Sequence, residues 1–432
     1  MPPGPGARGV SASIGLYRLV TRLAEPALPW LLKGRARKGK EDLARLGERL
    51  GRASQARPNG PLVWLHGASL GESLSLLPLI DRLTAARPDA EILVTAGTLT
   101  AAEVLAGRLP SGVIHQFSPV DAPGVANRFL DHWKPDLVVF AESELWPNLL
   151  FGAKARGAHM ALVSARMTQS SAERWRRLGG AARWVLTAFD LVLPQDAESS
   201  ERFESLGARP VGQLNLKLAG GPPPVDPRQL AALREAAAGR PVLLAASTHA
   251  GEDEIVLEAF AHIRSLQPEA LLVIAPRHPT RALEVLTLAR ASGFTADRRT
   301  EAAFGASDVH VADTLGELGL WFALADLSLV AGSLVPDIGG HNPMEPARLA
   351  RPFVSGPHVE SWRGVYAALE AADALVTVAD ARALAGAFLA AIAEPSIAAE
   401  RAERARVFAA GQGEALDGAV DQLAALLPAP TA

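Results

Sequence analysis

Short apolar runs alternate with longer amphipathic stretches from about residue 60 onward. Amphipathic segments with helical spacing lie at residues 73–86, 122–133 and 197–206. Runs with the composition of strands lie between and around them, at residues 61–66, 91–96, 136–141, 159–165, 190–195 and 209–213. Near-continuous apolar strands separated by helices predict a parallel sheet that is covered on both faces.

A break rich in glycine and proline interrupts this pattern at residues 219–227, which read AGGPPPVDP. The alternation then restarts, with strands expected at 241–247, 270–276 and 326–332 and helices at 251–266, 279–292, 379–391 and 397–409. No repeat of fixed period occurs, which excludes solenoids and propellers. We predict an α/β protein of two Rossmann-like doubly wound domains, with a ligand cleft at the carboxyl ends of their strands.

The N-terminal region has a different character. The apolar stretch 10–32 contains Arg18, Arg22, Glu25 and two prolines, so it is a poor membrane span and a poor signal peptide. A basic segment, residues 33–49, follows it. We expect a helix that lies on a membrane surface, and the alternative is a helix packed on its domain beside a solvated charge run.

These patterns divide the chain into four parts. The N-terminal apolar helix and basic collar occupy residues 1–40, and the first Rossmann-like domain, which would bind an acceptor, occupies residues 41–218. Residues 219–227 form the linker, and the second Rossmann-like domain extends from 228 to 432.

Composition narrows the possible functions. The chain has 432 residues, of which 49% are hydrophobic and 21% charged, and this excludes a disordered or fibrous protein. It contains no cysteine, which excludes a disulfide framework, a thiolate metal site and a cysteine nucleophile. A net charge of −3 argues against nucleic acid as a partner.

The first predicted strand ends in HGASLGES, residues 66–73. Gly67–Gly71 matches the G-x-S-x-G nucleophile elbow of serine hydrolases, but too few strands precede it for that fold. Ser69 and Glu72 also have the spacing of a capping box, which the spacing alone favours. The functional alternative is that Glu72, held at a strand-to-helix turn, acts as a general base.

A second pair of acids follows the strand at 136–141, in the segment AESELWPN. Glu142 and Glu144 stand at the carboxyl end of that strand, so they would share the cleft with Glu72. Equally, they could complement the dipole of the next helix.

Three loops of the second domain could bind a phosphate or a nucleotide. STHAGEDE at 247–254 offers hydroxyls and helix amides, and APRHP at 275–279 offers Arg277 and His278. GGHNPMEPA at 339–347 would place backbone amides on phosphate and Glu345 on ribose hydroxyls. The first loop could also be a simple cap, but all three loops adjoin strands of one domain.

Several motifs are missing from the sequence. It has no Walker A loop and no G-x-G-x-x-G fingerprint after a strand, which disfavours a P-loop NTPase or an NAD enzyme. It also has no D-x-D and no HExxH, so a bound metal is not expected.

Six motifs in order resemble those of the bacterial Kdo transferases, the 3-deoxy-D-manno-octulosonic acid transferases of lipopolysaccharide assembly (glycosyltransferase family 30). They are WLHGASLGES, VTAGTLTAAEV, FSPVDAPGVANRFLDHWKPDLVVFAESELWPNLL, STHAGEDE, APRHP and VAGSLVPDIGGHNPMEPA. The resemblance extends from about residue 35 to beyond residue 400, and several of the motifs are ten residues or longer.

This resemblance implies an inverting, metal-independent glycosyltransferase of the two-domain GT-B fold that uses no cofactor. It would move Kdo from CMP-Kdo to a lipid A precursor (lipid IVA) at the cytoplasmic face of the inner membrane. Glu72 would be the general base, and Ser69, Gly71, Glu142 and Glu144 would lie near the acceptor or the reacting sugar. The implied donor site contains Lys217, Ser247, Thr248, Glu252, Arg277, His278, Gly316, Glu317, Ser333, Gly340, His341, Asn342 and Glu345.

Two points depart from the family pattern, and two alternatives stay open. The N-terminal stretch carries charges, and residues 211–221 match only loosely the short Gly-Asn-Leu-Lys motif that would contain Lys217. The alternatives are another GT-B nucleotide-sugar transferase or epimerase, and a non-catalytic scaffold of lipopolysaccharide assembly. Glu72 argues against the scaffold, which needs no base.

Overall fold

The computed structural model describes residues 6–143, 145–177 and 180–429. The chain forms two compact units, Met1–Gly220 with Gln412–Ala432 and Gly221–Gly411. The sequence assigns everything from residue 228 onward to the second domain. In the structure the last segment belongs to the first unit, because Leu416, Val420 and Leu423 join its apolar core.

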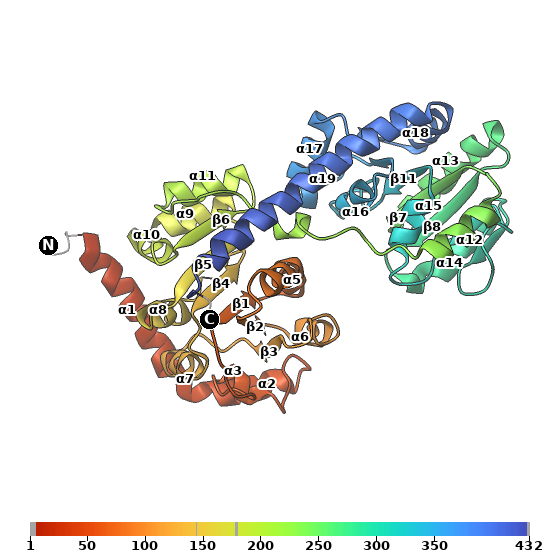
Figure 1. Cartoon of the computed structure of the whole chain (residues 1–432). Coiled ribbons are helices and arrows are strands. Elements are labelled where there is room, and N and C mark those ends of the chain that lie inside the picture. The colour runs from red at the N-terminus through yellow and green to blue at the C-terminus, as the bar shows by residue number, and fades with distance from the viewer. Residues whose placement is uncertain (1–5, 144, 178–179, 430–432) are drawn as a thin grey trace. The chain divides into compact units, whose positions relative to one another are not determined.

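The first unit contains a six-stranded parallel sheet in the order β3-β2-β1-β4-β5-β6 (Figure 1). Its strands are β1 Leu62–Gly67, β2 Glu91–Ala96, β3 Ile114–Phe117, β4 Leu137–Ala141, β5 His159–Ala165 and β6 Leu191–Pro194. The order reverses between β1 and β4, which are neighbours in space although β2 and β3 separate them in sequence. Ligands of doubly wound sheets bind at such a switch point, beyond the carboxyl ends of the strands.

Helices cover both faces of this sheet because its strands alternate their side chains between two apolar cores. Leu62 and Trp64 of β1 join one core, and Val63 and Leu65 join the other. The helices are α1 Gly6–Ala24, η1 Glu25–Ala27, α2 Leu28–Ala36, α3 Leu46–Arg49, α4 Leu70–Ser75, α5 Leu77–Ala86, α6 Leu99–Ala106, α7 Pro123–Trp133, α8 Pro147–Ala155, α9 Gln169–Arg177, α10 Gly180–Leu186, α11 Ala197–Ser205 and η2 Leu216–Leu218.

Five of the six strands expected in this unit are confirmed, and the sixth is wrong. Residues 209–213 form no strand, although Val211 and Leu214 each donate one backbone hydrogen bond to β6. Pro210 has no N–H to extend a ladder there. The strand missing from the prediction is β3, whose His115 and Gln116 break the apolar pattern.

The second unit contains a seven-stranded parallel sheet in the order β13-β12-β11-β7-β8-β10-β9. Its strands are β7 Val242–Thr248, β8 Leu271–Pro276, β9 Ala296–Arg298, β10 Val309–Val311, β11 Leu327–Val330, β12 Phe353–Ser355 and β13 Val376–Thr377. The switch point lies between β7 and β11. The three longest strands were predicted, whereas four strands of two or three residues were not.

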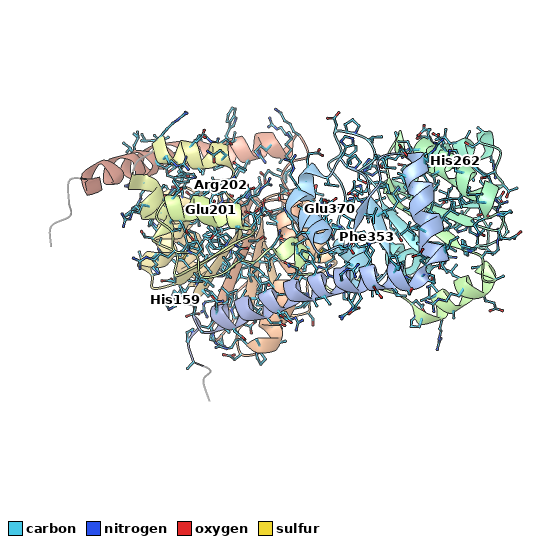
Figure 2. All side chains as sticks on the ribbon, turned by 90° about the horizontal axis from the view of Figure 1, so that it is seen from above. His159, Glu201, Arg202, His262, Phe353 and Glu370 are labelled. Atoms are coloured by element: carbon cyan, nitrogen blue, oxygen red, sulfur yellow. The ribbon has the colours of Figure 1, made fainter. Side chains whose placement is uncertain are left out.

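Helices of the second unit enclose its sheet, and Phe353, labelled in Figure 2, lies buried at the start of β12. They are α12 Pro227–Ala237, α13 Glu252–Leu266, η3 Pro279–Arg281, α14 Ala282–Ala291, α15 Leu318–Leu324, α16 Met344–Arg348, η4 Glu360–Trp362, α17 Arg363–Ala371, α18 Ala381–Ala393 and the first part of α19 Pro395–Ala424. Among the described residues, no single helix has the length and apolar composition needed to cross a membrane. Only α18 and α19 taken together reach them, with a bend of 105° between the two.

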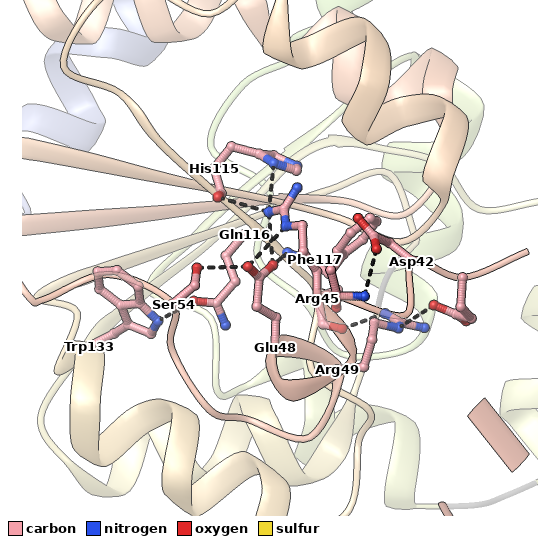
Figure 3. A network of polar contacts seen from close by, with 12 residues as sticks. Asp42, Arg45, Glu48, Arg49, Ser54, His115, Gln116, Phe117 and Trp133 are labelled. Carbon is pink, nitrogen blue, oxygen red and sulfur yellow. Dashed lines mark hydrogen bonds and ion pairs between the residues drawn. The ribbon is translucent and has the colours of Figure 1, made fainter. Parts of the chain in front are cut away.

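Part of the basic segment, residues 33–49, is tied into the first unit (Figure 3). Glu48 is buried, and its carboxylate accepts hydrogen bonds from Arg45, from Ser54 and from the backbone N–H of Phe117. Likewise Glu41 forms ion pairs with Arg35 and Arg49. The basic segment is therefore not simply a solvated charge run, and its exposed cations, those of the collar, include Lys33, Arg37, Lys38 and Lys40.

Candidate active site

Glu72 lies in the first turn of α4, shortly after the carboxyl end of β1. Its Oε2 accepts the backbone N–H of Ala68 at 2.8 Å, and its Oε1 accepts the hydroxyl of Ser69, also at 2.8 Å. Ser69 Oγ accepts the N–H of Glu72 at 3.3 Å and so caps α4. Glu72 is only half-buried, so it faces solvent at the same time as it caps the helix.

The backbone at Ser69 does not form a nucleophile elbow. Its φ of −104° and ψ of 167° are extended, whereas the elbow holds its serine in a strained turn. The hydroxyl is directed to Glu72. Gly71, the residue before Glu72, is exposed, and a Cβ at that position would meet open space.

Glu142 follows β4, the strand beside β1. Its φ of 56° lies in the left-handed region, which is strained for a residue with a side chain. Its Oε1 forms an ion pair of 2.7 Å with Nζ of Lys217. The structure therefore places Lys217, expected in the donor site, beside an acid of the first unit, and Glu144 lies outside the described residues.

In the second unit, the expected donor residues gather at the carboxyl ends of β7, β8 and β11. Ser247 and Thr248 end β7, Arg277 and His278 follow β8, and Ser333 follows β11. The backbone N–H of Arg277 donates to the carbonyl of Thr248 at 3.0 Å, which joins the first two loops. Ser247 has a φ of 63°, so the chain turns sharply there.

Glu252 holds the loops after β7 and β11 together. Its side chain is completely buried. Its two oxygens accept four backbone N–H groups, at 2.8–3.0 Å, from His249, Gly332, Ser333 and Leu334. A carboxylate has about four acceptor positions, and the protein fills all of them. This geometry makes Glu252 part of the frame of the site and leaves no oxygen for the donor contact expected from the sequence.

Ser333 is likewise engaged within the protein. Its hydroxyl donates to the carbonyl of Val330 at 2.7 Å and accepts the N–H of Gly356 at 2.8 Å. A Cβ at Gly356 would lie 2.0 Å from the carbonyl oxygen of Ser333, so this close approach requires glycine.

A histidine pair lies beside these loops. The Nε2 atoms of His249 and His341 are 2.9 Å apart, and their rings stack. Burial lowers the pKa of His341 to about 4, with further contributions from His249 and Arg277, so His341 is neutral near pH 7. The carbonyl of His341 accepts the hydroxyl of Tyr366 at 2.9 Å, and Gly340 donates its N–H to Gly332 at 2.8 Å.

Arg277 is an exposed cation of this region. Its charge lowers the pKa of His249 and His341, although burial is the largest cause for both. Burial raises the pKa of Glu345, and Arg348 and Arg277 oppose that change. The side chain of Asn342 accepts the N–H of Met344, which shapes the turn into α16.

Gly316 and Glu317 lie between β10 and α15, on the side of the sheet where the carboxyl ends of the strands lie. Glu317 forms an ion pair with Arg299 at 3.0 Å and accepts the hydroxyl of Thr314. The hydrogen bond from Arg299 is the main cause that lowers the pKa of Glu317. Within the described ranges, no group of three or more His, Asp or Glu residues could hold a metal ion.

Sequence reasoning missed several residues that support these loops. Asp253 is buried, and its Oδ2 lies 2.7 Å from Arg281, whose Nη1 also donates to the carbonyl of Thr248 at 3.5 Å. Tyr366 was missed too. Arg281 follows His278 by one turn, but nothing local shows that it faces Asp253.

The first unit matches the family model described as 3-Deoxy-D-manno-octulosonic-acid transferase (kdotransferase), over residues 44–219. The 3-deoxy-D-manno-octulosonic acid transferase of Bordetella pertussis is 33% identical over 427 residues, which cover 95% of this chain and 98% of the relative. A protein of Arabidopsis thaliana described as a probable mitochondrial 3-deoxy-D-manno-octulosonic acid transferase is 32% identical, covering 83% of each chain. This chain belongs to the Kdo transferases, which are glycosyltransferases that add Kdo.

Solved structures agree on the fold. A glycosyltransferase from Rickettsia africae superposes with a TM-score of 0.58 at 11% identity, covering 85% of this chain and 99% of that one. The UDP-GlcNAc 2-epimerase from Neisseria meningitidis gives a TM-score of 0.55 at 14% identity, covering 84% and 99%. The two units are therefore the two Rossmann-like domains of the GT-B fold.

Proposed function

We propose that this Kdo transferase moves Kdo from CMP-Kdo to a lipid A precursor at a membrane surface, by an inverting reaction without a metal. Membership of the family supports the reaction. The observation that carries the roles of residues is the placement of Glu72 and Arg277. Each stands beyond the carboxyl ends of strands in its own unit, where doubly wound domains bind ligands.

Glu72 is the proposed general base. In the transfer, an acceptor hydroxyl attacks the anomeric carbon of Kdo and loses its proton to the Glu72 carboxylate. The bond from that carbon to the phosphate oxygen breaks, and its electron pair leaves with CMP. The hydrogen bonds from Ala68 and Ser69 fix the carboxylate, and its half-buried position leaves it accessible to the incoming hydroxyl.

The donor anion needs positive charge and hydrogen-bond donors rather than an acid, because CMP leaves as a phosphate monoester. Arg277 is exposed at the end of β8 and lies within electrostatic range of His341 and Glu345. We assign it to the phosphate or the sugar carboxylate of CMP-Kdo, with His278 and the backbone of Gly340 to Asn342 beside it.

Replacing Arg277 by alanine should weaken CMP binding by about 10- to 100-fold, since a hydrogen bond to a charged group contributes about 1.5–3 kcal/mol. Calorimetric titration with CMP measures this loss. Arg382→Ala, on the exposed face of α18 in the same unit, is the matched control and should bind CMP normally. Normal affinity in Arg277→Ala would remove Arg277 from the site.

We assign the contact with the membrane to helix α1. Leu16, Leu19, Val20 and Leu23 repeat at helical spacing, and all four are more than half exposed. Trp30 of α2 is 80% exposed, and the cations of the collar follow it in sequence. An exposed apolar stripe next to basic residues is the pattern of a helix that lies in the interface of an anionic membrane.

The double substitution Leu19→Gln and Leu23→Gln should lower binding to vesicles that contain phosphatidylglycerol at least about tenfold, because it removes apolar area from the lipid contact. Co-sedimentation measures this. Leu266→Gln, equally exposed at the end of α13 in the second unit, is the control. Unchanged binding of the double variant would show that α1 makes no lipid contact.

The proposed reaction is tested by incubating the protein with labelled Kdo activated in situ as CMP-Kdo, a lipid A precursor and EDTA. A Kdo-bearing lipid product is expected, and its mass counts the sugars added. If the folded protein binds CMP but gives no product, the proposed acceptor is wrong. Product that appears only when a divalent ion is restored would overturn metal independence.

A further inference from the structure

Helix α8 begins without a cap of its own. Trp146 occupies the N-cap position and makes no capping hydrogen bond through its side chain, and Pro147, the first helical residue, has no N–H. The first free donors of the helix are the backbone N–H groups of Asn148 and Leu149. A helix start that is buried needs acceptors for these groups.

Asp121, from the distant loop before α7, supplies those acceptors. Its Oδ2 accepts the N–H of Asn148 at 3.1 Å, and its Oδ1 accepts the N–H of Leu149 at 2.8 Å. The side-chain amide of Asn148 donates to the backbone carbonyl of Asp121 at 3.0 Å. Asp121 thus caps α8 from 27 and 28 residues away in the sequence, and the residue is 5% exposed.

The same cap is bonded to α1. Tyr17 donates its hydroxyl to Oδ2 of Asp121 at 2.8 Å, and Thr21 accepts the side-chain amide of Asn148 at 3.2 Å. One turn further, Glu25 accepts the N–H of Gly124 at 2.8 Å. These three residues recur every four positions, so α1 and the start of η1 present a polar stripe to the rest of the first unit.

This arrangement reverses the usual one. A helix on a soluble domain normally turns apolar residues inward, yet α1 makes these polar contacts inward and leaves its leucine stripe exposed. Burial raises the pKa of Asp121, and its hydrogen bonds, including the one from Tyr17, oppose that change. The tyrosine hydroxyl therefore offsets part of the cost of burying the carboxylate.

We propose that Asp121, together with Tyr17 and Thr21, is a positioning device that sets the acceptor loop, of which the structure describes residues 142–143 and 145–146, according to the place of α1. The loop ends where α8 begins, and it carries Glu142 after β4. Fixing the start of α8 fixes the downstream end of the loop. The proposal rests on the proposed function, because it takes the first unit as the acceptor site and α1 as its lipid contact.

The test is the double variant Tyr17→Phe with Thr21→Val, which keeps the size of both side chains and leaves Asp121 to cap α8. The apparent KM for the lipid acceptor should rise about tenfold, while the KM for CMP-Kdo stays close to wild type. The thermal midpoint should fall, because the buried Asp121 carboxylate loses the hydrogen bond from Tyr17. Thr287→Val on α14 is the matched control. The hydroxyl of Thr21 donates to the carbonyl of Tyr17, and the hydroxyl of Thr287 likewise donates to the carbonyl of Leu283, so we expect no change in the control.

A second readout does not depend on activity. Because the chain has no cysteine, Ser143→Cys provides a single site for a nitroxide label on the loop. The label should become more mobile in the double variant than in the parent. Unchanged mobility together with an unchanged acceptor KM would overturn the proposal. Equal changes in the KM for both substrates would show a general structural role instead.

The two readouts separate this proposal from the proposed function. If the wild-type protein transfers no Kdo, the proposed function fails, and label mobility alone still decides whether α1 sets the loop. Restoring Tyr17 in the double variant while leaving Thr21→Val should recover more than half of the lost acceptor affinity, since Tyr17 contacts the carboxylate directly. No recovery would show that the Tyr17 hydroxyl does not set the loop.

Discussion

Glu72→Ala is expected to lower kcat about 10²- to 10⁴-fold, the range that a general base contributes, while CMP binding changes little. The reason is that the acceptor hydroxyl would have no group in place to take its proton, whereas the donor residues lie in the other unit. Rates of Kdo transfer measured at saturating acceptor and donor, per folded molecule, give the effect directly.

The same carboxylate also caps α4, so its capping role needs its own control. Thr98 caps α6 after the neighbouring strand β2 by accepting the N–H of Ala101, and it has no proposed role in the chemistry. Thr98→Ala should cost about 1 kcal/mol of stability and leave the rate per folded molecule unchanged. If Glu72→Ala behaves like Thr98→Ala, Glu72 serves only as a cap.

Ser69→Ala divides the two roles further. It removes the hydroxyl that donates to Oε1 of Glu72 but leaves the bond from Ala68 to Oε2. We expect a smaller loss of rate than in Glu72→Ala, because the base stays present but is held less firmly. A loss of rate as large as that of Glu72→Ala would show that Ser69 itself takes part in the reaction.

The sequence predicts the site well where neighbouring residues carry the signal. Glu72 could be found because its strand, its glycines and its capping serine are adjacent in the chain. Arg277 and His278 could be found because an apolar strand runs directly into them. In both units the long buried strands were predicted, since four or more apolar residues in a row distinguish them from loops.

The parts that sequence reasoning missed depend on contacts between distant segments. Tyr17 and Asp121 are 104 residues apart, and no local pattern shows that one donates to the other. The strands β9 and β10 have three residues each, which is too short for a periodic signal. Lys217 was assigned from a loosely matching motif, and its partner Glu142 lies on another loop of the same unit.

Glu252 shows the same limit most clearly, because its acidic neighbours in the sequence suggest an exposed helix start. Asp253 next to it is also buried, while Glu254 is exposed. What buries Glu252 is the loop after β11, about 80 residues later, whose three consecutive N–H groups converge on its carboxylate. Successive amides that converge in this way form an anion site, and here the protein supplies the anion itself.

Glu252→Ala should therefore destabilise the second unit by about 3–5 kcal/mol, because three buried N–H groups and one partly buried N–H group lose their acceptor together. Denaturant unfolding of the full chain, followed by a signal from the second unit, measures this. Glu254→Ala, two residues along the same helix, is the control and should change stability by less than about 0.5 kcal/mol. Binding of CMP should weaken in Glu252→Ala even where the variant is folded, since the loops that it joins carry the donor site.

Glu252→Gln separates a frame residue from a donor contact. The amide keeps the size of the side chain, but its NH₂ cannot accept hydrogen bonds from the N–H groups that it would face. We therefore expect a loss of stability between those of the wild type and Glu252→Ala. If Glu252 touches the donor instead, Glu252→Gln should unfold like the wild type and lose only affinity for CMP. A lower free energy of unfolding in Glu252→Gln would show that Glu252 orders the loops after β7 and β11.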